Sequence, residues 1–241
     1  MNITKEIKII DLALFIKKSK SLIISDLHLG YEDALKKQGV LIPKLQYKEI
    51  INRLNYIFSK LSKINEVVFN GDLKHEFGSI NRQEWKETLN ILDFIRSKGA
   101  KIIVIKGNHD TILNPILKKK NIKEIKELRI NNILIAHGDY IPKKLEKFII
   151  IGHEHPAVTL RDSAKYEKFK CFLKGKFKNS VLIVQPSFNN ITEGKDVLKE
   201  KTLSPFLKDI ENFECFIVND NTHEILNFGK IKNIKKNIKK N

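Results

Sequence analysis

The stretch KIIVIKGNHDT, residues 101–111, joins an apolar run to three consecutive polar residues. Its first five residues are mostly apolar and β-branched, which is typical of a strand in a buried sheet. A lysine and a glycine follow, and then an amide, an imidazole and a carboxylate at Asn108, His109 and Asp110. A buried strand that ends this way leads either into a polar turn or into a loop that presents reactive side chains.

Short apolar runs of the same kind recur along the chain and predict further strands. They cover residues 21–25, 66–69, 101–105, 132–136, 147–151, 181–184 and 215–218. Between the early runs, residues 44–63 and 83–98 carry apolar side chains at helical spacing. Strands that alternate with helices predict parallel pairing through βαβ crossovers. After about residue 130 the helices become rare, so we expect an α/β fold in which two mixed β-sheets pack as a sandwich flanked by helices.

The bulk properties indicate a single soluble domain. A chain of 241 residues with 41% hydrophobic content can bury a sizeable core. No apolar run is long enough to cross a bilayer, and the N-terminus lacks the pattern of a secretory signal. Two cysteines, Cys171 and Cys215, are too few for a disulfide framework, so we expect free thiols and a cytoplasmic protein. Residues 1–229 are predicted to form the domain, and residues 230–241 a basic tail that is either a frayed helix or flexible, with a polyanion-binding arm as the alternative.

The net charge of +17 is unusual for a chain of this length. A basic excess of this size indicates a polyanionic partner, of which nucleic acid is the obvious class. Only five of the 45 basic residues are arginine, although arginine is the preferred residue for bidentate phosphate contacts. Codon bias or growth at high temperature also produces lysine-rich chains. Both interpretations of the charge therefore stay open.

Side chains that can bind metal ions follow five of the predicted strands. The segments are Asp26-Leu27-His28, Gly71-Asp72, Asn108-His109-Asp110, His137-Gly138-Asp139 and His153-Glu154-His155. Six of the seven histidines lie in or beside these segments. Because strand ends converge on one crevice in open α/β sheets, ligands that are far apart in sequence can meet there.

Seven of these side chains are suitable protein ligands. They are Asp26, His28, Asp72, Asn108, His137, His153 and His155. One ion with about four or five protein ligands cannot use all seven, whereas two ions that share a carboxylate can. Mixed imidazole and carboxylate donors suit Mn, Fe, Zn, Co or Ni better than Mg or Ca. Residues i and i+2 of an extended backbone face the same side, so each D-x-H and H-x-H pair is expected to point into one crevice.

The ordered set D-x-H, G-D, G-N-H-D, H-G-D and G-H-x-H resembles the calcineurin-like metallophosphoesterase superfamily from Asp26 to His155. The stretches GDLKHEFG (71–78), GHEHP (152–156) and QPSFN (185–189) are most similar to a compact SbcD-related group. That group includes archaeal proteins and phosphoesterases associated with bacterial DNA ligases. The resemblance implies the four-layer α/β/β/α fold of the superfamily.

The resemblance also implies a role for each matched position. One ion would be held by Asp26, His28 and His155, the other by Asn108, His137 and His153, with Asp72 shared between them. Two divalent cations, expected to be Mn²⁺ with Fe, Zn, Co or Ni as alternatives, neutralise phosphodiester charge and lower the pKa of water. His109 would stabilise the transition state or protonate the leaving oxygen, and Asp110 would hold its ring in place.

Four further side chains have more than one interpretation. His75 stands where SbcD-type nucleases often carry an aspartate, and it could orient His109, contact the phosphate or start a helix. Asp139 could orient His137 or belong to a cap or turn. Glu154 lies between two ligands and is expected to face away into solvent. His223 lies in a predicted hairpin and is expected to be a surface histidine.

Three functions are compatible with the sequence. The first is a phosphodiesterase or nuclease acting on single-stranded DNA or RNA, which the resemblance and the basic, aromatic stretch 161–178 favour. A solvated hairpin with buried aromatics is the other interpretation of that stretch, and for the stretch taken alone it is the preferred one. The second is a phosphatase for small nucleotides or phosphomonoesters, and the third a non-catalytic binding scaffold. No membrane partner is expected, and a DNA-repair helicase or ligase is a partner by analogy only.

Overall fold

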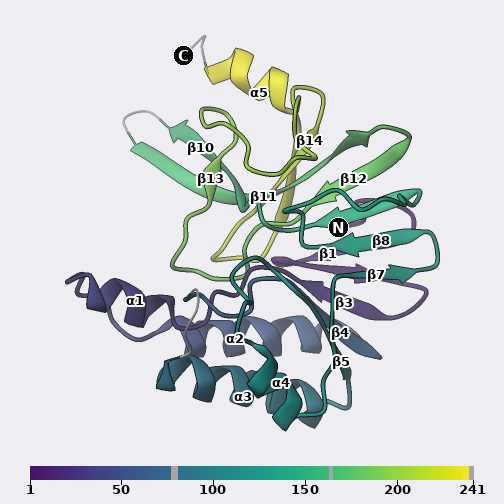
Figure 1. The fold of residues 1–241 in the computed structure, drawn as a ribbon. Helices are drawn as coiled ribbons and strands as arrows, with labels where there is room; N and C mark the ends of the chain where they lie inside the picture. Colours follow the sequence, from purple (N-terminus) through teal and green to yellow (C-terminus); the bar gives the residue numbers. More distant parts are fainter. Residues whose placement is uncertain (77–80, 163–164, 239–241) are drawn as a thin grey trace.

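The computed structural model describes residues 1–76, 81–162 and 165–238, and its centre consists of two β-sheets packed face to face (Figure 1). The first sheet contains six strands in chain order. They are β1 (Ile7–Ile10), β2 (Ala13–Ile16), β3 (Ser21–Ile24), β4 (Glu66–Asn70), β5 (Lys101–Ile105) and β6 (Glu124–Ile125). Strands β3 to β6 pair in parallel, as the predicted crossovers require. Strands β1 and β2 add an antiparallel hairpin at the edge.

The second sheet is mixed and contains nine strands among the described residues. They are β7 (Glu127–Ile130), β8 (Ile133–Ala136), β9 (Phe148–Ile151), β10 (Pro156–Asp162), β11 (Lys165–Phe177), β12 (Ser180–Val184), β13 (Lys195–Asp196), β14 (Glu214–Val218) and β15 (Ile225–Lys230). Strands β8, β9 and β12 are parallel neighbours, and β11 pairs antiparallel with both β12 and β14. The two sheets therefore both contain a parallel region.

The core between the sheets follows from the two-residue period of a strand. In β9, Phe148 and Ile150 pack into the core that both sheets share, whereas Ile149 and Ile151 face the opposite side of the second sheet. The same alternation runs along β8, β12 and β14. Because both faces of the second sheet are covered at its centre, strands β8, β9, β12 and β14 consist mostly of consecutive apolar residues.

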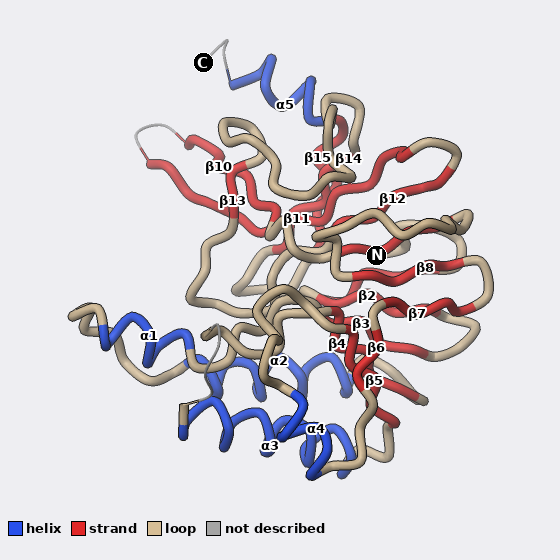
Figure 2. Tube along the Cα trace, in the orientation of Figure 1, coloured by secondary structure: helices blue, strands red, loops and turns tan. Residues whose placement is uncertain are grey.

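Helices cover the outer face of the first sheet (Figure 2). They are α2 (Gln46–Ser59), α3 (Arg82–Ser97) and α4 (Asn114–Lys119), whereas α1 (Tyr31–Lys37) extends away from the sheet (Figure 1). Helix α2 buries Ile50, Leu54 and Ile57 on one side, because apolar residues at this spacing share a helix face. Helix α3 begins with a capping box in which Asn81 and Glu84 each accept a hydrogen bond from the other's backbone N–H.

The outer face of the second sheet is covered by residues 197–213 and by helix α5 (Ile231–Ile238). Ile231 and Ile234 of α5 are buried against this face. The expectation of a flexible tail from residue 230 therefore does not describe residues 231–238, and residues 239–241 lie outside the described residues. The three-residue spacing of these isoleucines places them on one side of a helix, which the lysine-rich composition concealed.

The predicted fold class is confirmed, and all seven predicted strands and both predicted helices are present within one to four residues at each end. The short strands at sheet edges were not predicted, because their polar residues interrupt the apolar runs, whereas the β10–β11 hairpin agrees with the hairpin interpretation of residues 161–178. Cys171 and Cys215 are free and buried, as expected. Within the described part of the chain, no helix has the length and apolarity to span a membrane.

Candidate metal centre

The five ligand-bearing segments meet at one edge of the sandwich. Strands β3, β4 and β5 are parallel, so the residues after Ile24, Asn70 and Ile105 leave the first sheet on the same side. Strands β8 and β9 are also parallel, and the residues that follow them leave the second sheet together. The backbone N–H of His153 donates to the Asp26 carboxylate, which joins the two sheets at this edge.

Five of the seven predicted ligands have a left-handed backbone, in which φ is positive. The φ angles are 56° at Asp26, 46° at His28, 48° at Asp72, 65° at His153 and 48° at His155. The expectation that each i, i+2 pair lies on an extended backbone is therefore wrong, although both pairs still converge. Non-glycine residues adopt this conformation at a cost, and such strain is found where a surrounding site holds it in place.

Asp26, His28 and His155 form the first ligand group. Their potential ligand atoms all lie within 4.8 Å of one another. The His155 Nε2 atom is 3.2 Å from an Asp26 oxygen and 3.3 Å from the His28 Nε2 atom. Two imidazole nitrogens and one carboxylate oxygen therefore face a common point.

Asp72, His137 and His153 form the second group, again within 4.8 Å of one another. The His137 Nε2 atom is 3.3 Å from Asp72 Oδ2, 3.2 Å from His153 Nδ1 and 2.9 Å from Asn108 Oδ1. Asn108 therefore joins this group, as the sequence predicts.

Asp72 lies between the two groups. Its Oδ2 atom is 3.3 Å from His137 Nε2 and 3.9 Å from His28 Nε2, which belong to different groups. Its Oδ1 atom accepts a hydrogen bond of 2.8 Å from the backbone N–H of His109. All seven predicted ligands are thus brought together, with Asp72 in the shared position.

The protonation states suit a cation site. Burial works against ionisation of Asp72, but the hydrogen bond and charge of His137 hold the pKa of this carboxyl below its usual value. Asp26 behaves alike: burial opposes ionisation, and His155 and His137 nevertheless keep its pKa low. Burial lowers the pKa of His28 well below 6.5 and also lowers the pKa of His153, so both rings are neutral at neutral pH. Neutral imidazoles and ionised carboxylates are the forms that bind metals.

His137 is the exception among the imidazoles. Burial alone would lower its pKa, but the Asp72 and Asp26 carboxylates outweigh burial and raise the pKa to about 10. This ring therefore carries the positive charge that balances the two carboxylates, a task that a bound cation can perform instead. The donor set, with four imidazoles, two carboxylates and one amide oxygen, fits divalent transition metals.

Glycines allow the ligand loops to approach closely. A Cβ atom at Gly107 would collide with the Asp72 carboxylate, and a Cβ atom at Gly152 would collide with Asp26 and Ser25. The glycines in K-G-N and G-H-x-H are thus required by close packing of neighbouring ligand loops, which the sequence alone did not indicate.

The His109 ring lies beside the first ligand group and belongs to neither of the two ligand groups. Its ring packs edge to face on His28, with 4.9 Å between ring centroids. Its Nδ1 atom is 2.6 Å from the backbone carbonyl of His75. Because a carbonyl only accepts hydrogen bonds, Nδ1 carries a proton, and Nε2 is the ring nitrogen through which His109 would exchange a proton with a substrate.

Asp110 does not hold the His109 ring. Its buried carboxylate accepts hydrogen bonds from the backbone N–H groups of Leu73, Lys74 and Gly107. The predicted orienting role is therefore corrected: the His75 carbonyl orients His109, while Asp110 ties the loop after β5 to the loop after β4. Asp side chains commonly accept hydrogen bonds from nearby backbone N–H groups, and here these bonds take the place of a contact with the neighbouring ring.

His75 belongs to the site through its ring as well. The ring stacks on His109 at 5.6 Å, and packs against Tyr31 at 4.1 Å, between ring centroids. Burial and the neighbouring His109 lower the pKa of His75 to about 4. His28, His75 and His109 also place ring nitrogens within 4.8 Å of one another. Tyr31 carried no sequence signal, because it lies three residues beyond a motif.

Two residues beside the candidate ligands remain to be placed, namely Asp139, which could orient His137 or belong to a cap or turn, and Glu154, which was expected to face solvent. Asp139 is exposed at the rim, whereas the Nδ1 atom of His137 faces the carbonyl of Asn70 at 3.3 Å. Glu154 was expected in solvent, but it is fully buried and accepts hydrogen bonds from the backbone N–H groups of Leu203 and Ser204. The extended loop 199–213 packs over this position, and its unpaired donors require a buried acceptor.

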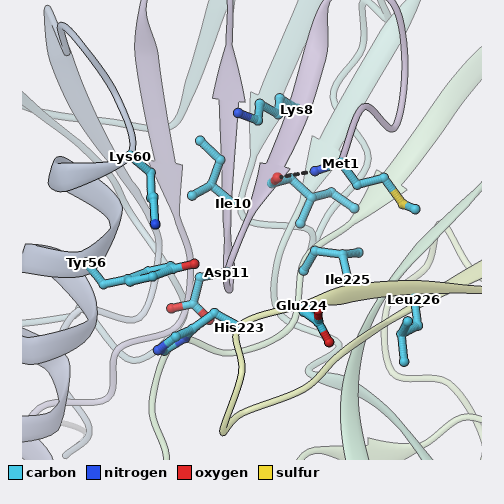
Figure 3. A pocket seen from close by; sticks show the side chains of 11 residues that line it. Met1, Lys8, Ile10, Asp11, Tyr56, Lys60, His223, Glu224, Ile225 and Leu226 are labelled. Carbon is cyan, nitrogen blue, oxygen red and sulfur yellow. Dashed lines mark hydrogen bonds and ion pairs between the residues drawn. The ribbon is translucent and has the colours of Figure 1, made fainter.

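His223 lies away from the metal centre, in the β14–β15 turn, as the sequence predicts. It stacks on Tyr56 at 4.0 Å between centroids and faces Asp11 at 3.3 Å (Figure 3). Lys60 lies 5.1 Å from the centre of the Tyr56 ring. These side chains line a pocket of about 430 Å³ beside β1 and β15, where Asp11 also binds Arg53.

A second pocket adjoins the metal centre. It has a volume of about 400 Å³ and is lined by Lys106, Asn108, Lys126, Asp139 and Tyr140, among others. Asn108 belongs to the second ligand group, so the pocket opens directly beside it. Lys106 and Lys126 are exposed and supply positive charge at its wall.

One comparison with a solved structure supports the fold. The crystal structure of the Pseudomonas putida nuclease MPE superposes with a TM-score of 0.65 at 16% identity, covering 92% of this chain and 94% of that chain. The Escherichia coli phosphoesterase YfcE matches at 14% identity, 86% and 96% coverage and a TM-score of 0.45. Zinc-bound Vps29 from Entamoeba histolytica matches at 16% identity, 87% and 98% coverage and a TM-score of 0.37. No curated protein matches the chain.

A family model described as calcineurin-like phosphoesterase matches residues 19–211. This range covers most of the chain and includes all seven ligand positions. Membership of the finer SbcD-related group stays a prediction. Together with the fold and the geometry of the metal centre, the match shows that the chain belongs to the calcineurin-like phosphoesterase family.

Proposed function

We propose that this protein is a phosphodiesterase that uses two divalent cations, expected to be Mn²⁺, and acts on single-stranded nucleic acid. The position of Asp72 carries the proposal. Its carboxylate lies between two complete ligand groups, at 3.3 Å from His137 and 3.9 Å from His28. A shared carboxylate between two imidazole-rich groups is the arrangement that holds a pair of cations.

The chain supplies the remaining parts of a hydrolytic site. When bound, the cations would neutralise the phosphate charge and lower the pKa of a water molecule toward neutrality. His109 has Nδ1 bound to the His75 carbonyl, so its Nε2 atom is held in one orientation for moving a proton. A general acid at this atom would protonate the leaving oxygen of the diester.

The pocket beside Asn108 supports a phosphodiester as the substrate, in which the phosphorus carries an organic group on each side. Its volume of about 400 Å³ is sufficient for a nucleoside unit. Lys106 and Lys126 would attract a neighbouring phosphate, and Tyr140, 36% exposed, offers an aromatic ring to a base.

The β10–β11 hairpin is a second feature that supports nucleic acid as the substrate. It begins at Pro156, directly after the ligand His155. Tyr166 is 62% exposed, and the Arg161 and Lys199 side chains lie 5.7 Å and 5.8 Å from its ring centre. Phe172 of the same hairpin is buried, as the interpretation of stretch 161–178 as a hairpin with buried aromatics predicts, whereas Tyr166 is not. An exposed aromatic between cations suits single-stranded nucleic acid.

A phosphatase for small nucleotides is the second candidate, because the pocket beside Asn108 also accommodates one mononucleotide. A non-catalytic scaffold has less support, since all seven ligands and His109 are present at the site. The P. putida structure, described as a nuclease, supports the first candidate as an analogy of fold.

The two candidates are separated by one substrate panel. We expect hydrolysis of bis-p-nitrophenyl phosphate and of labelled single-stranded DNA or RNA with Mn²⁺, and loss of both activities in EDTA. Hydrolysis of p-nitrophenyl phosphate and mononucleotides alone would favour the phosphatase. Absence of turnover with Mn²⁺, Co²⁺, Ni²⁺ and Zn²⁺ in a sample that binds these ions would contradict both.

A further inference from the structure

Lys170 of β11 is a buried cation, with 4% of its surface exposed. Its ammonium group donates to the Ser187 carbonyl and the Ser187 hydroxyl, each at 2.9 Å, and to the Asn189 carbonyl. All three partners are neutral, and none of the ion pairs among the described residues includes Lys170. A buried charge without a counter-ion is costly, so this lysine needs an explanation beyond packing.

The loop that Lys170 holds is the QPSFN segment, residues 185–189. The Gln185 N–H donates to the Ile151 carbonyl at 2.8 Å, and the Phe188 N–H donates to the Ser25 carbonyl at 2.9 Å. The Gln185 side chain also donates to the Ile23 carbonyl at 3.1 Å. The loop therefore connects the end of β3 with the end of β9.

Both attachment points lie next to metal ligands. Ser25 precedes Asp26, and Ile151 lies two residues before His153. The hydroxyl of Ser25 also donates to the Asn70 carbonyl at 2.9 Å, and Asn70 lies two residues before the shared ligand Asp72. A shift of the loop would move ligands of both groups, because Gly152 packs against Ser25 and Asp26 without space to spare.

We propose that Lys170 is a positioning residue of the metal centre, which it stabilises through the backbone of residues 185–189. The proposal rests on the proposed two-cation site but not on its substrate. Burial lowers the pKa of Lys170 to about 7, because desolvation disfavours the ammonium form. Charges on Asp220, Asp26 and Asp11 favour the ammonium form of Lys170, and the charge on Arg53 opposes it.

The test measures Mn²⁺ binding to the full chain by calorimetry, without substrate. We expect Lys170→Met to weaken the affinity for at least one ion by about 10- to 100-fold, as groups that orient metal ligands commonly do. Lys168→Met is the matched control, because Lys168 lies on the same strand and contacts the Gly194 carbonyl and Glu193. Its affinity should equal that of the wild type.

Hydrogen exchange supplies a readout that separates positioning from general stability. In Lys170→Met, the amides of Gln185 and Phe188 should exchange faster, while those in the centre of β4 and β5 stay protected. If Lys170→Met does not fold, Ser187→Ala removes one acceptor and should weaken Mn²⁺ binding to a smaller extent. Wild-type affinity in either folded variant would overturn the proposal. Wild-type protein that binds two ions but hydrolyses nothing would refute the proposed function alone.

Discussion

At the scale of single residues, several residues of the metal centre have a backbone conformation or a buried charge that is unfavourable on its own. Contacts within the site stabilise them. Asp26, His28, Asp72, His153 and His155 all have positive φ angles. Asp72 and Asp26 are buried and yet keep low pKa values, because His137 and His155 lie against them. Each residue in isolation would relax, so the geometry depends on mutual contacts.

His109 offers the sharpest test at this scale. Replacing His109 with Ala should lower kcat/KM by about 10²- to 10⁴-fold, since positioned acid–base groups contribute about that much. Mn²⁺ stoichiometry should remain two, because neither ligand group requires this ring. Steady-state kinetics and calorimetry check both outcomes, with His223→Ala as a control that should match the wild type. Loss of an ion in His109→Ala would show that His109 is a ligand.

Asp110 is predicted to act on stability rather than chemistry. Asp110→Ala leaves three buried backbone N–H groups without their acceptor. We expect the free energy of unfolding to fall by about 3 kcal/mol or more, since each unsatisfied buried donor costs about 1–3 kcal/mol. Urea denaturation measures this, and the exposed Asp139→Ala should change little. An Asp110→Ala protein that is as stable as the wild type would remove the structural role assigned here.

At the scale of secondary-structure elements, each strand has two tasks. Its apolar residues pack the core, and the residues directly after it carry the chemistry, as β5 and its Asn108–Asp110 loop illustrate. The loops are connected by specific pairs, of which Asp110 with Lys74 and Ser25 with Asn70 are examples. Ligands on different strands thereby act as one site.

Helix α5 makes an element-level prediction, because its burial contradicts a flexible tail. Ile234 is 6% exposed and packs against the second sheet. Ile234→Ala should lower the free energy of unfolding by about 2 kcal/mol, at the low end for a buried isoleucine because α5 is near the chain end. Lys232→Ala, on the exposed side, is the control. Equal urea midpoints for both variants would mean that α5 does not dock in solution.

At the scale of the whole molecule, the two sheets bring two half-sites together. The first group takes Asp26 and His28 from the first sheet and His155 from the second, and the second group is divided in the same way. Neither sheet alone holds a complete ligand group. The net charge of +17 gives the whole chain an attraction for polyanions.

Salt dependence tests the polyanion at this scale. Binding of single-stranded DNA should weaken as salt rises, with log K falling against log salt by about 0.7 for each phosphate contacted. Fluorescence anisotropy across a salt series measures the slope. Replacing Lys106 and Lys126 with Ala should reduce the slope, whereas Lys98→Ala, at the end of α3, should not. An affinity that ignores salt would exclude the nucleic-acid interpretation of the charge.

The sequence by itself predicted seven of the strands and the fold class, and it indicated the seven candidate ligands whose side chains the structure brings together. Apolar periodicity encodes strands locally, and metal-binding side chains at strand ends stand out wherever they occur in order. It also indicated His109 as a residue of the site, because His109 directly follows Asn108 in the chain.

Only the tertiary structure decided the partners of Asp110, Glu154 and Lys170, and the docking of α5. Their partners lie between 3 and 50 positions away along the chain, and several are backbone groups that carry no sequence signature. A buried charge is satisfied by whichever donor or acceptor the packed loops leave unpaired, and that choice exists only once the two sheets have come together.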